Sequence, residues 1–293
     1  MRLEGVYTAI VTPFQQDGSV DEKALREFVD FQIDGGVSGL VPVGTTGESP
    51  TVTHEENLRV IAVVVEQTRG RVPVIAGTGS NSTQEAINMT RRAKELGADG
   101  TLQVAPYYNK PSQEGMYRHF SAIADATDLP LIVYNIPGRT GKNVENDTML
   151  RLSSHPNIIG VKEASGDIPQ MMDLIARKPA DFVVISGDDN LAYPLMALGG
   201  SGVISVASNM IPDRMSEMVK LALAGKYEAA REAHYKLLPL FRALFSETNP
   251  VPVKYGLSVM GRIEEVYRLP LCAMDDQKKQ VLKDVMRSLG LTR

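Results

Sequence analysis

The sequence has little of what disulfide frameworks, zinc sites and membrane spans require. It contains one cysteine, Cys272, four histidines and no tryptophan. A single thiol excludes an internal disulfide, and one cysteine with four scattered histidines matches no zinc-binding spacing. We therefore expect Cys272 to be a small buried hydrophobe. No apolar run approaches the roughly 20 residues that cross a bilayer.

A strong charge of either sign is absent as well. The 31 basic and 35 acidic residues are interspersed and leave a formal net charge of −4. A protein that binds nucleic acid or anionic membranes would be expected to carry a basic excess. Residues 1–5 lead into an apolar run without the pattern of a signal peptide. These features predict a soluble cytoplasmic protein whose partners are small molecules or copies of itself.

What is present is a repeated unit of apolar run, loop and helical pattern. The runs stand at 6–11, 39–43, 72–76, 101–105, 129–134, 158–161, 182–186 and 202–206. They are continuously apolar, as expected for parallel strands that are buried on both faces. Eight such units predict an α/β protein with the (β/α)8 TIM barrel fold, which takes roughly 250 residues. We place this barrel at residues 1–224.

Residues 225–293 show helical patterns alone, at 227–245, near 253–260 and at 276–288. We expect a C-terminal helical extension that packs rigidly on the barrel and covers apolar surface or forms an oligomer contact. A doubly wound open sheet is the alternative fold. That sheet would be expected to place its phosphate-binding turn after the first strand, whereas the turn at Gly77-Thr78-Gly79 follows the third.

Two helices are predicted to begin at capping boxes. Thr53 is followed three residues later by Glu56, and Ser82 is followed at the same spacing by Glu85. In a capping box the hydroxyl accepts from an N–H of the first turn, and the carboxylate reaches back to the N–H of the cap residue.

Lys162 ends the sixth apolar run, directly before Glu163. Lysine is disfavoured in apolar surroundings, so Lys162 is either paired with an acid such as Glu163 or kept for its amine. Burial disfavours the ammonium form and can lower a lysine pKa from about 10.4 to roughly 7–8. A neutral amine attacks carbonyl carbons and forms a Schiff base, which aldolases use to make a carbanion without a metal.

In a barrel, the groups that act on a substrate directly follow the strands. Here those positions hold one amine, several hydroxyls and one guanidinium, at Thr45, Thr46, Tyr107, Tyr108, Tyr134, Arg139, Lys162 and Gly187. Tyr134 alone is equally well explained as a core tyrosine, and Arg139 alone as a solvated charge. The combination is what indicates a site.

The turn at residues 44–49 is predicted to bind a small carboxylate. Gly44 and Gly47 are expected to adopt positive φ angles, so that the backbone N–H groups and the hydroxyls of Thr45 and Thr46 face the anion. Arg139 suits a second carboxylate, because its planar guanidinium donates two parallel hydrogen bonds.

Three segments together resemble the signatures of the dihydrodipicolinate synthase family: 44–49 (GTTGES), 134–140 (YNIPGRT) and 160–164 (GVKEA). The similarity extends over essentially the whole chain, including residues 106–115, 186–189 and 249–254. The wider family, with N-acetylneuraminate lyase and the 2-keto-3-deoxy sugar-acid aldolases, shares the lysine, the glycine-threonine turn and the barrel. Arg139 in its Pro-Gly-Arg-Thr context separates the synthases from those relatives.

The resemblance implies a lyase that needs no cofactor and no metal. It would condense pyruvate with L-aspartate 4-semialdehyde to give 4-hydroxy-tetrahydrodipicolinate, on the diaminopimelate route to lysine. Lys162 would form the Schiff base, and Thr45 and Thr46 would hold the pyruvate carboxylate. Arg139 would bind the carboxylate of the aldehyde, while Gly187 and the backbone of Ile204 line the pocket.

The resemblance also implies an assembly. Thr46, Tyr134 and Tyr108 would relay protons, with Tyr108 crossing from the neighbouring subunit of a dimer, and a homotetramer built from dimers is expected. Ligands for feedback inhibition by lysine at a subunit interface are implied at Ser49, His54, Asn81, Glu85 and Tyr107. Pro50 and Asn57 depart from the pattern of inhibited members, and the capping box is the other interpretation of Glu85.

Other functions stay open on the sequence alone. An N-acetylneuraminate lyase-like or 2-keto-3-deoxy sugar-acid aldolase activity is the alternative within the wider family. A non-catalytic binding protein would be expected to have lost the lysine or the tyrosines. A metal-dependent enzyme would need clustered ligands, and the strand ends offer Glu48, Glu163 and Asp188 without a nearby histidine.

Overall fold

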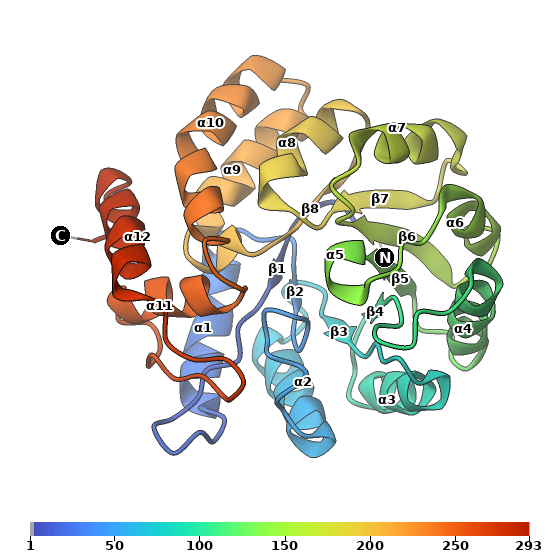
Figure 1. Cartoon of the computed structure of the whole chain (residues 1–293), viewed down its shortest axis with the longest axis horizontal. Coiled ribbons are helices and arrows are strands. Elements are labelled where there is room, and N and C mark those ends of the chain that lie inside the picture. Colours follow the sequence, from blue (N-terminus) through green and yellow to red (C-terminus); the bar gives the residue numbers. More distant parts are fainter. Residues whose placement is uncertain (1–2, 293) are drawn as a thin grey trace.

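The computed structural model describes residues 3–292, and within them eight parallel strands form one sheet in the order β2-β1-β8-β7-β6-β5-β4-β3. The strands are β1 (Gly5–Ala9), β2 (Gly39–Val41), β3 (Ile75–Gly77), β4 (Gly100–Val104), β5 (Leu131–Asn135), β6 (Ile158–Glu163), β7 (Val183–Ser186) and β8 (Gly202–Ser205). Helices surround the sheet, as seen nearly end-on in Figure 1.

The two ends of the strand order, β2 and β3, meet and close the sheet into a barrel. Leu40 and Val74 form a parallel bridge, and the Gly77 N–H donates to the Pro42 carbonyl oxygen at 3.0 Å. The predicted (β/α)8 barrel is therefore confirmed, and the open doubly wound sheet is not the fold.

The predicted strand boundaries are wrong by a few residues at several ends. β2 ends at Val41, because Pro42 has no N–H to continue the ladder and Val43 has a φ of 50°. β6 instead continues through Lys162 and Glu163, which pair in register with Tyr134 and Asn135. Lys162 thus lies inside the strand, near its carboxyl end.

Helices follow the strands, and three further helices follow the barrel. Their bounds are α1 (Glu22–Asp34), α2 (His54–Thr68), α3 (Thr83–Glu95), α4 (Gln113–Asp125), α5 (Pro137–Thr140), α6 (Asn146–Leu152), α7 (Ile168–Arg177), α8 (Asp189–Ala197), η1 (Ala207–Asn209), α9 (Pro212–Leu223), α10 (Tyr227–Ala243), α11 (Val251–Val259) and α12 (Asp276–Ser288). The short α5 lies over the end of the barrel in Figure 1.

The two capping boxes differ. At α2 both arms form: the Glu56 N–H donates to the Thr53 hydroxyl, and the Thr53 N–H donates to the Glu56 carboxylate at 2.9 Å. At α3 the Glu85 N–H donates to the Ser82 hydroxyl, but the Glu85 carboxylate accepts from the Ser80 hydroxyl and does not reach back to Ser82. The prediction of a complete second box is wrong in that arm.

The apolar core has an interior and an outer layer. The barrel interior is filled by a cluster that includes Tyr7, Ile132, Tyr134, Ile185 and Ile204. Outside the sheet, one cluster joins α1 and α2 to side chains of α9, α10, α11 and α12. The C-terminal helices therefore pack on the barrel through a shared apolar core, on one side of the molecule in Figure 1. The division into residues 1–224 and 225–293 stays a prediction.

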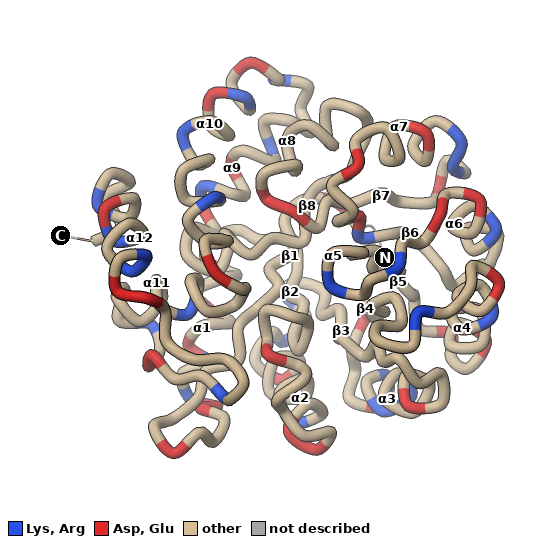
Figure 2. The backbone as a smooth tube through the Cα atoms, in the orientation of Figure 1, with Lys and Arg blue, Asp and Glu red and all other residues tan. Residues whose placement is uncertain are grey.

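Basic and acidic residues are interspersed along the helices and loops around the barrel (Figure 2). None of the helices in residues 3–292 combines the length and apolar composition that a membrane span requires. Cys272 is exposed, so its predicted burial is wrong. It lies between α11 and α12, in a stretch without regular structure whose side chains have no periodic face to bury.

Candidate active site

Lys162 and Tyr134 form the centre of the site, on adjacent strands. The register pairs Tyr134 of β5 with Lys162 of β6, and the Lys162 Nζ lies 4.1 Å from the centroid of the Tyr134 ring. Both side chains are about 5% exposed. An amine and a phenol are thus held together near the carboxyl ends of two strands, where barrel enzymes carry their chemistry.

Burial lowers the pKa of Lys162 to about 7, as desolvation penalises its ammonium form. The negative charge of Asp189 opposes this shift, and the positive charge of Arg139 adds to it. Burial also raises the pKa of Tyr134 to about 12. At neutral pH the site therefore holds a lysine that is partly unprotonated beside a phenol that keeps its proton.

Glu163 does not pair with Lys162, because consecutive residues of a strand face opposite sides of the sheet. The Glu163 carboxylate accepts from Asn135 Nδ2 at 3.1 Å and from the Ser165 N–H at 2.7 Å. Of the two interpretations that the sequence left open, the structure therefore contradicts a Lys162–Glu163 ion pair.

Gly187 lies against the lysine chain, and Ile204 lies in the barrel interior. A Cβ atom added at Gly187 would lie 2.9 Å from Lys162 Cε and 2.8 Å from Ala164 Cβ, so only glycine leaves room for the lysine chain there. Ile204 lies on β8 and is fully buried in the barrel interior with Tyr134. Their part in lining the substrate pocket stays a prediction.

The turn after β2 brings Thr45 and Thr46 to the same end of the barrel. Its hydrogen bonds run from the Gly47 N–H and the Ser49 N–H to the Gly44 carbonyl oxygen. Within residues 3–292, the N–H groups of Thr45 and Thr46 find no acceptor, which leaves two donors for an anion.

The expected positive φ angles at Gly44 and Gly47 are wrong. The left-handed conformations fall on Val43 and Glu48, with φ of 50° and 56°. Gly47 is needed for another reason: a Cβ there would lie 3.0 Å from the Val43 backbone and 3.2 Å from the Ile10 carbonyl oxygen. The glycine allows a close backbone approach rather than an unusual dihedral angle.

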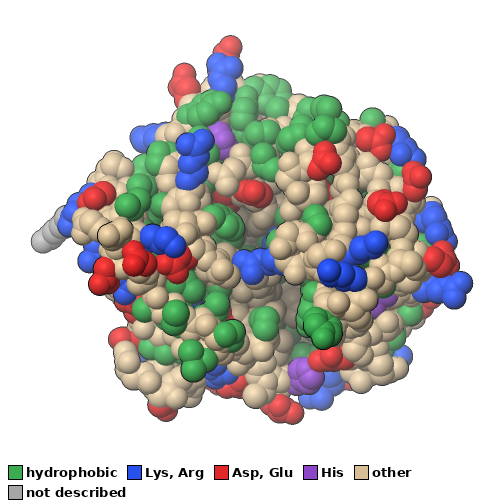
Figure 3. Space-filling view, viewed as in Figure 1, with side chains coloured by type: hydrophobic (Ala, Val, Ile, Leu, Met, Phe, Trp, Pro, Cys, Tyr) green, Lys and Arg blue, Asp and Glu red, His purple; other side chains and the backbone are tan. Residues whose placement is uncertain are grey.

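Arg139 lies in α5, on the rim of the site. It is exposed, and its Nη2 donates to the carbonyl oxygen of Asn249 at 3.1 Å. Viewed from this side, the surface is hollowed near its centre, with basic side chains at the rim of the hollow (Figure 3). A guanidinium that keeps free N–H groups at this rim suits an incoming carboxylate.

Tyr107 and Tyr108 lie in the loop between β4 and α4. The Tyr108 side chain is 90% exposed and the residue has a φ of 71°, while Tyr107 is 41% exposed. Tyr108 therefore does not join Tyr134 within its own chain. An exposed aromatic ring on a strained loop is available to a second copy of the chain.

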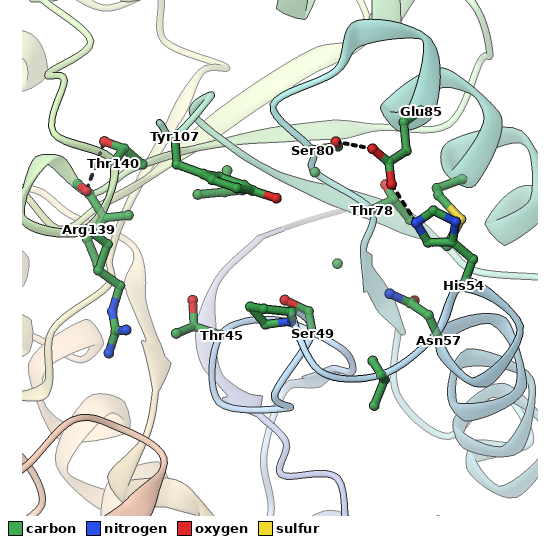
Figure 4. A pocket seen from close by; sticks show the side chains of 17 residues that line it. Thr45, Ser49, His54, Asn57, Thr78, Ser80, Glu85, Tyr107, Arg139 and Thr140 are labelled. Atoms are coloured by element: carbon green, nitrogen blue, oxygen red, sulfur yellow. Dashed lines mark hydrogen bonds and ion pairs between the residues drawn. The ribbon is translucent and has the colours of Figure 1, made fainter. Parts of the chain in front are cut away.

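A cavity of about 400 Å³ runs from the active-site rim toward α2 and α3. Thr45 and Arg139 lie at one end of it, His54, Asn57 and Glu85 lie at the other, and Ser49 and Tyr107 lie between them (Figure 4). There the Glu85 carboxylate pairs with His54 Nε2 at 2.5 Å. Asn81 does not line the cavity, but its Nδ2 donates to the Tyr107 carbonyl oxygen at 3.2 Å.

Two buried residues, one close enough to affect the Lys162 charge and one in contact with Thr46, were not predicted as functional. The Asp189 carboxylate accepts from the N–H groups of Val206 and Ala207 at 3.0 and 2.8 Å, and burial raises its pKa to about 6. Asn249 donates from Nδ2 to the Thr46 hydroxyl oxygen at 2.9 Å. The Asp188-Asp189 pair directly after an apolar run was a signal that could have identified the first.

The three carboxylates that a metal site would have used lie apart. Glu48 pairs with Lys254, Glu163 faces Asn135, and Asp188 caps α8. Among residues 3–292, no three side chains of histidine, cysteine, aspartate or glutamate are grouped so that they could hold a metal ion.

The reactivity of the Lys162 amine should depend on pH, and the charge of Asp189 should set the pH at which this reactivity appears. Reactivity toward a ketone should rise as the pH passes about 7 and Lys162 loses its proton. Asp189→Asn removes a negative charge that raises the pKa of Lys162, so the rise should move to lower pH. A pH profile of kcat/KM measures this pKa in the free enzyme.

Asp188→Asn is the matched control, because Asp188 caps α8 and asparagine caps helices equally well. Its profile should coincide with that of the wild type. A shift to higher pH in Asp189→Asn, or no shift, would contradict the assignment of the rise to Lys162.

Comparison with known proteins places these features in a family. The model of the dihydrodipicolinate synthetase family matches residues 2–289. A curated relative from Koribacter versatilis, named 4-hydroxy-tetrahydrodipicolinate synthase, is 52% identical over 294 residues, with 100% of this chain and 98% of the relative covered.

Solved structures agree with that match. A chloride-inhibited dihydrodipicolinate synthase from Acinetobacter baumannii, complexed with pyruvate, is 46% identical with a TM-score of 0.97, and the match covers 99% of this chain and 100% of that chain. A DHDPS from Cyanidioschyzon merolae with lysine bound is 42% identical with a TM-score of 0.96, and the match covers 98% of each chain.

Proposed function

The chain belongs to the dihydrodipicolinate synthetase family, and we infer from this membership that it is a lyase that condenses pyruvate with L-aspartate 4-semialdehyde to give 4-hydroxy-tetrahydrodipicolinate. This reaction lies on the diaminopimelate route to lysine. The observation that best supports the chemistry is the buried Lys162, with a pKa of about 7, against the Tyr134 ring. A neutral amine at this place can form a Schiff base.

The proposed roles follow the course of the reaction. The Lys162 amine attacks the keto carbon of pyruvate, and water leaves as the Schiff base forms. Loss of a methyl proton gives an enamine, whose carbon attacks the aldehyde carbon of the second substrate. The amine of that substrate then closes the ring on the former keto carbon, which releases Lys162 unchanged.

Backbone and hydroxyl groups hold the substrates during these steps. The free N–H groups and hydroxyls of Thr45 and Thr46 bind the pyruvate carboxylate, which is the anion that the turn after β2 suits. Tyr134 carries protons to and from the reacting atoms; Thr46 was the threonine predicted for this relay, but the side chain hydrogen-bonded to Tyr134 is that of Thr45, while the Thr46 hydroxyl oxygen accepts from Asn249. Gly187 and the backbone of Ile204 line the space around the adduct.

A second copy of the chain completes the relay in this proposal. Tyr108 is 90% exposed on its own chain, which leaves its side chain accessible to a neighbouring subunit. We propose a homotetramer built from dimers in which Tyr108 of each subunit enters the partner's site, in a cytoplasmic enzyme.

The choice of aldehyde should depend on Arg139. Arg139→Ala removes a bidentate contact to a carboxylate worth roughly 1.5–3 kcal/mol, so kcat/KM for aspartate semialdehyde should fall about 10- to 150-fold. Arg139→Lys keeps the charge but loses the planar pair of donors, and should recover only part of this loss. Coupled assays that vary each substrate measure both effects.

Formation of the pyruvate adduct is the internal control for Arg139, because it precedes binding of the aldehyde. It should survive in Arg139→Ala. If the wild-type protein instead condenses pyruvate preferentially with N-acetylmannosamine or another sugar aldehyde, the proposed second substrate is wrong. The alternative activity, that of an N-acetylneuraminate lyase or a 2-keto-3-deoxy sugar-acid aldolase, is then correct.

We also propose that the far end of the cavity binds lysine as a feedback inhibitor. His54 and Glu85 lie there, Ser49 and Tyr107 line the middle of the cavity next to them, and the Glu85 carboxylate faces His54 instead of closing a capping box. A carboxylate in this position can pair with an ammonium group of the effector. The related DHDPS from Cyanidioschyzon merolae has been solved with lysine bound, which supports the assignment.

Millimolar lysine should therefore inhibit the wild-type enzyme. Glu85→Gln removes the charge that pairs with the effector and should raise the half-inhibitory concentration of lysine about tenfold. A change of this size lies within the coupling free energy of about 1–3 kcal/mol that is typical between an effector site and an active site. Steady-state assays with increasing lysine test this, with Glu95→Gln on the same helix as a control that leaves inhibition unchanged. Full activity of the wild type in millimolar lysine would contradict feedback inhibition at this site. The Glu85–His54 pair would then have a structural role only.

A further inference from the structure

Glu48 lies at the end of the turn after β2, and the C-terminal extension holds its carboxylate. Lys254 Nζ, on α11, lies 2.5 Å from Glu48 Oε1, and the N–H of Arg268 donates to Glu48 Oε2 at 3.4 Å. The side chains of Glu48 and Lys254 are almost fully buried. Both oxygens of this carboxylate thus have partners that lie 206 and 220 residues further along the chain.

The same turn carries Thr45, which contacts the centre of the proposed site. The Glu48 N–H donates to the Thr45 carbonyl oxygen at 3.1 Å, and the Thr45 side chain is hydrogen-bonded to Tyr134. The Tyr134 ring in turn lies 4.1 Å from Lys162 Nζ. Two hydrogen bonds therefore connect the backbone of Glu48 to the ring beside the reactive lysine.

The backbone of the turn depends on contacts that support it. Val43 and Glu48 both have left-handed conformations, with φ of 50° and 56°. Residues with a Cβ atom keep such conformations only where the surrounding structure determines them. Near Glu48 this support comes from the ion pair with Lys254 and from the Thr12 hydroxyl, which donates to the Gly47 carbonyl oxygen at 2.7 Å.

Of the two partners in this ion pair, α11 is fixed and the turn is the part that can move. Val251 and Leu257 of α11 are buried in the outer apolar cluster. The Lys254 Nζ also lies 4.2 Å from the centroid of the Phe14 ring, which confines it further. Residues 44–49 carry no apolar side chain that could anchor the turn in the same way.

We propose that Glu48 and Lys254 are positioning residues that fix the turn after β2, so that it can bind the pyruvate carboxylate and keep Thr45 against Tyr134. A buried ion pair adds little net stability over apolar residues of the same size, because desolvation of both charges offsets their attraction. We assign it the role of fixing one geometry instead. This inference rests on the proposed function and deepens it, since the C-terminal extension then takes part in binding the first substrate. Its expected role of covering apolar surface or forming an oligomer contact is incomplete.

The two substrates should respond differently when the ion pair is replaced. Glu48→Met combined with Lys254→Met introduces apolar chains of similar length, so the melting temperature should equal that of the wild type or exceed it. The released turn should raise KM for pyruvate and slow formation of the Lys162 adduct, each about tenfold. KM for the aldehyde should stay within about twofold, because Arg139 donates to the carbonyl oxygen of Asn249, which directly precedes the fixed segment.

Glu48→Gln separates positioning from stability in the opposite direction. The amide oxygen of glutamine still accepts from Lys254 Nζ, so the turn stays in place and KM for pyruvate should stay within about threefold. The buried ammonium group loses its compensating charge, so the melting temperature should fall. If the loss of activity instead follows the loss of melting temperature, the pair has a role in stability only and the inference is wrong.

A second ion pair of the C-terminal extension provides the matched control. Lys279 Nζ lies 2.7 Å from Glu265 Oε1, and this pair includes no residue of the turn. Replacing both residues with methionine should leave both KM values within about twofold. Thermal unfolding shows whether each variant folds, and Glu48→Gln with Lys254→Met serves as the test if the methionine pair does not fold.

An unchanged KM for pyruvate and an unchanged rate of adduct formation in the folded methionine pair would overturn the inference. Equal losses for both substrates would overturn it as well. Failure of the inference is distinguishable from failure of the proposed function. If the wild type does not condense pyruvate with aspartate semialdehyde, the function is wrong. If it does, but the methionine pair keeps the wild-type KM for pyruvate, only the role of Glu48 and Lys254 is wrong.

Discussion

Replacing Lys162 with methionine should abolish condensation while leaving the protein folded. The amine is the only group of the protein that forms a covalent bond with pyruvate in the proposed mechanism, so its loss should lower kcat by on the order of 10⁴-fold or more. Methionine has a similar length and no charge, and it removes the cost of burying an ammonium group. The melting temperature should therefore be equal to that of the wild type or higher.

Lys162→Arg gives the complementary result. Arginine keeps a positive charge but stays protonated, so it cannot act as a nucleophile and should be as inactive as methionine. It should also destabilise the protein, since a bulkier permanent charge is buried beside Gly187. If Lys162→Met kept more than about one per cent of the wild-type activity, Lys162 would not be the nucleophile that forms the Schiff base.

Tyr134→Phe should give the second largest loss. Phenylalanine keeps the ring that lies 4.1 Å from the lysine Nζ and removes only the hydroxyl. If that hydroxyl passes protons, kcat should fall about 10²- to 10⁴-fold, the usual contribution of a positioned acid or base. The pKa of about 12 means that the phenol carries its proton at neutral pH and can donate it first.

The step that slows in Tyr134→Phe identifies the role. Rapid-quench measurements with borohydride should show slower formation of the pyruvate adduct, with the same final yield on Lys162. The ring still fills the barrel interior, so the melting temperature should change little. Wild-type rates in this variant would show that Tyr134 is a core residue, the interpretation that the sequence left open.

The barrel and the centre of the site could be predicted because their signals are local. Eight apolar runs define the strands, and Lys162 stands out because a lysine at the end of a buried run is costly. Side-chain alternation along β6 then separates Lys162 from Glu163, which the sequence alone left undecided. The turn of Thr45 and Thr46 was found for its glycines, although their predicted dihedral angles were wrong.

The contacts between distant segments could not be predicted, because no local pattern reports them. Thr46 and Asn249 are 203 residues apart in the sequence, and Glu48 and Lys254 are 206 apart. The carboxylate of Glu85 had an adequate local partner in Ser82, yet in the fold it faces Ser80 and His54. Burial of Cys272 was inferred from residue type, which carries no information about an irregular exposed segment.

One measurement tests the central claim most directly: reduction of the wild-type enzyme with borohydride in the presence of pyruvate, followed by mass spectrometry of the peptides. The account predicts a pyruvate-derived mass on the peptide that contains Lys162, and the same reaction with Lys162→Met should give none. An adduct on another lysine, or an unmodified Lys162 after complete reaction, would contradict it.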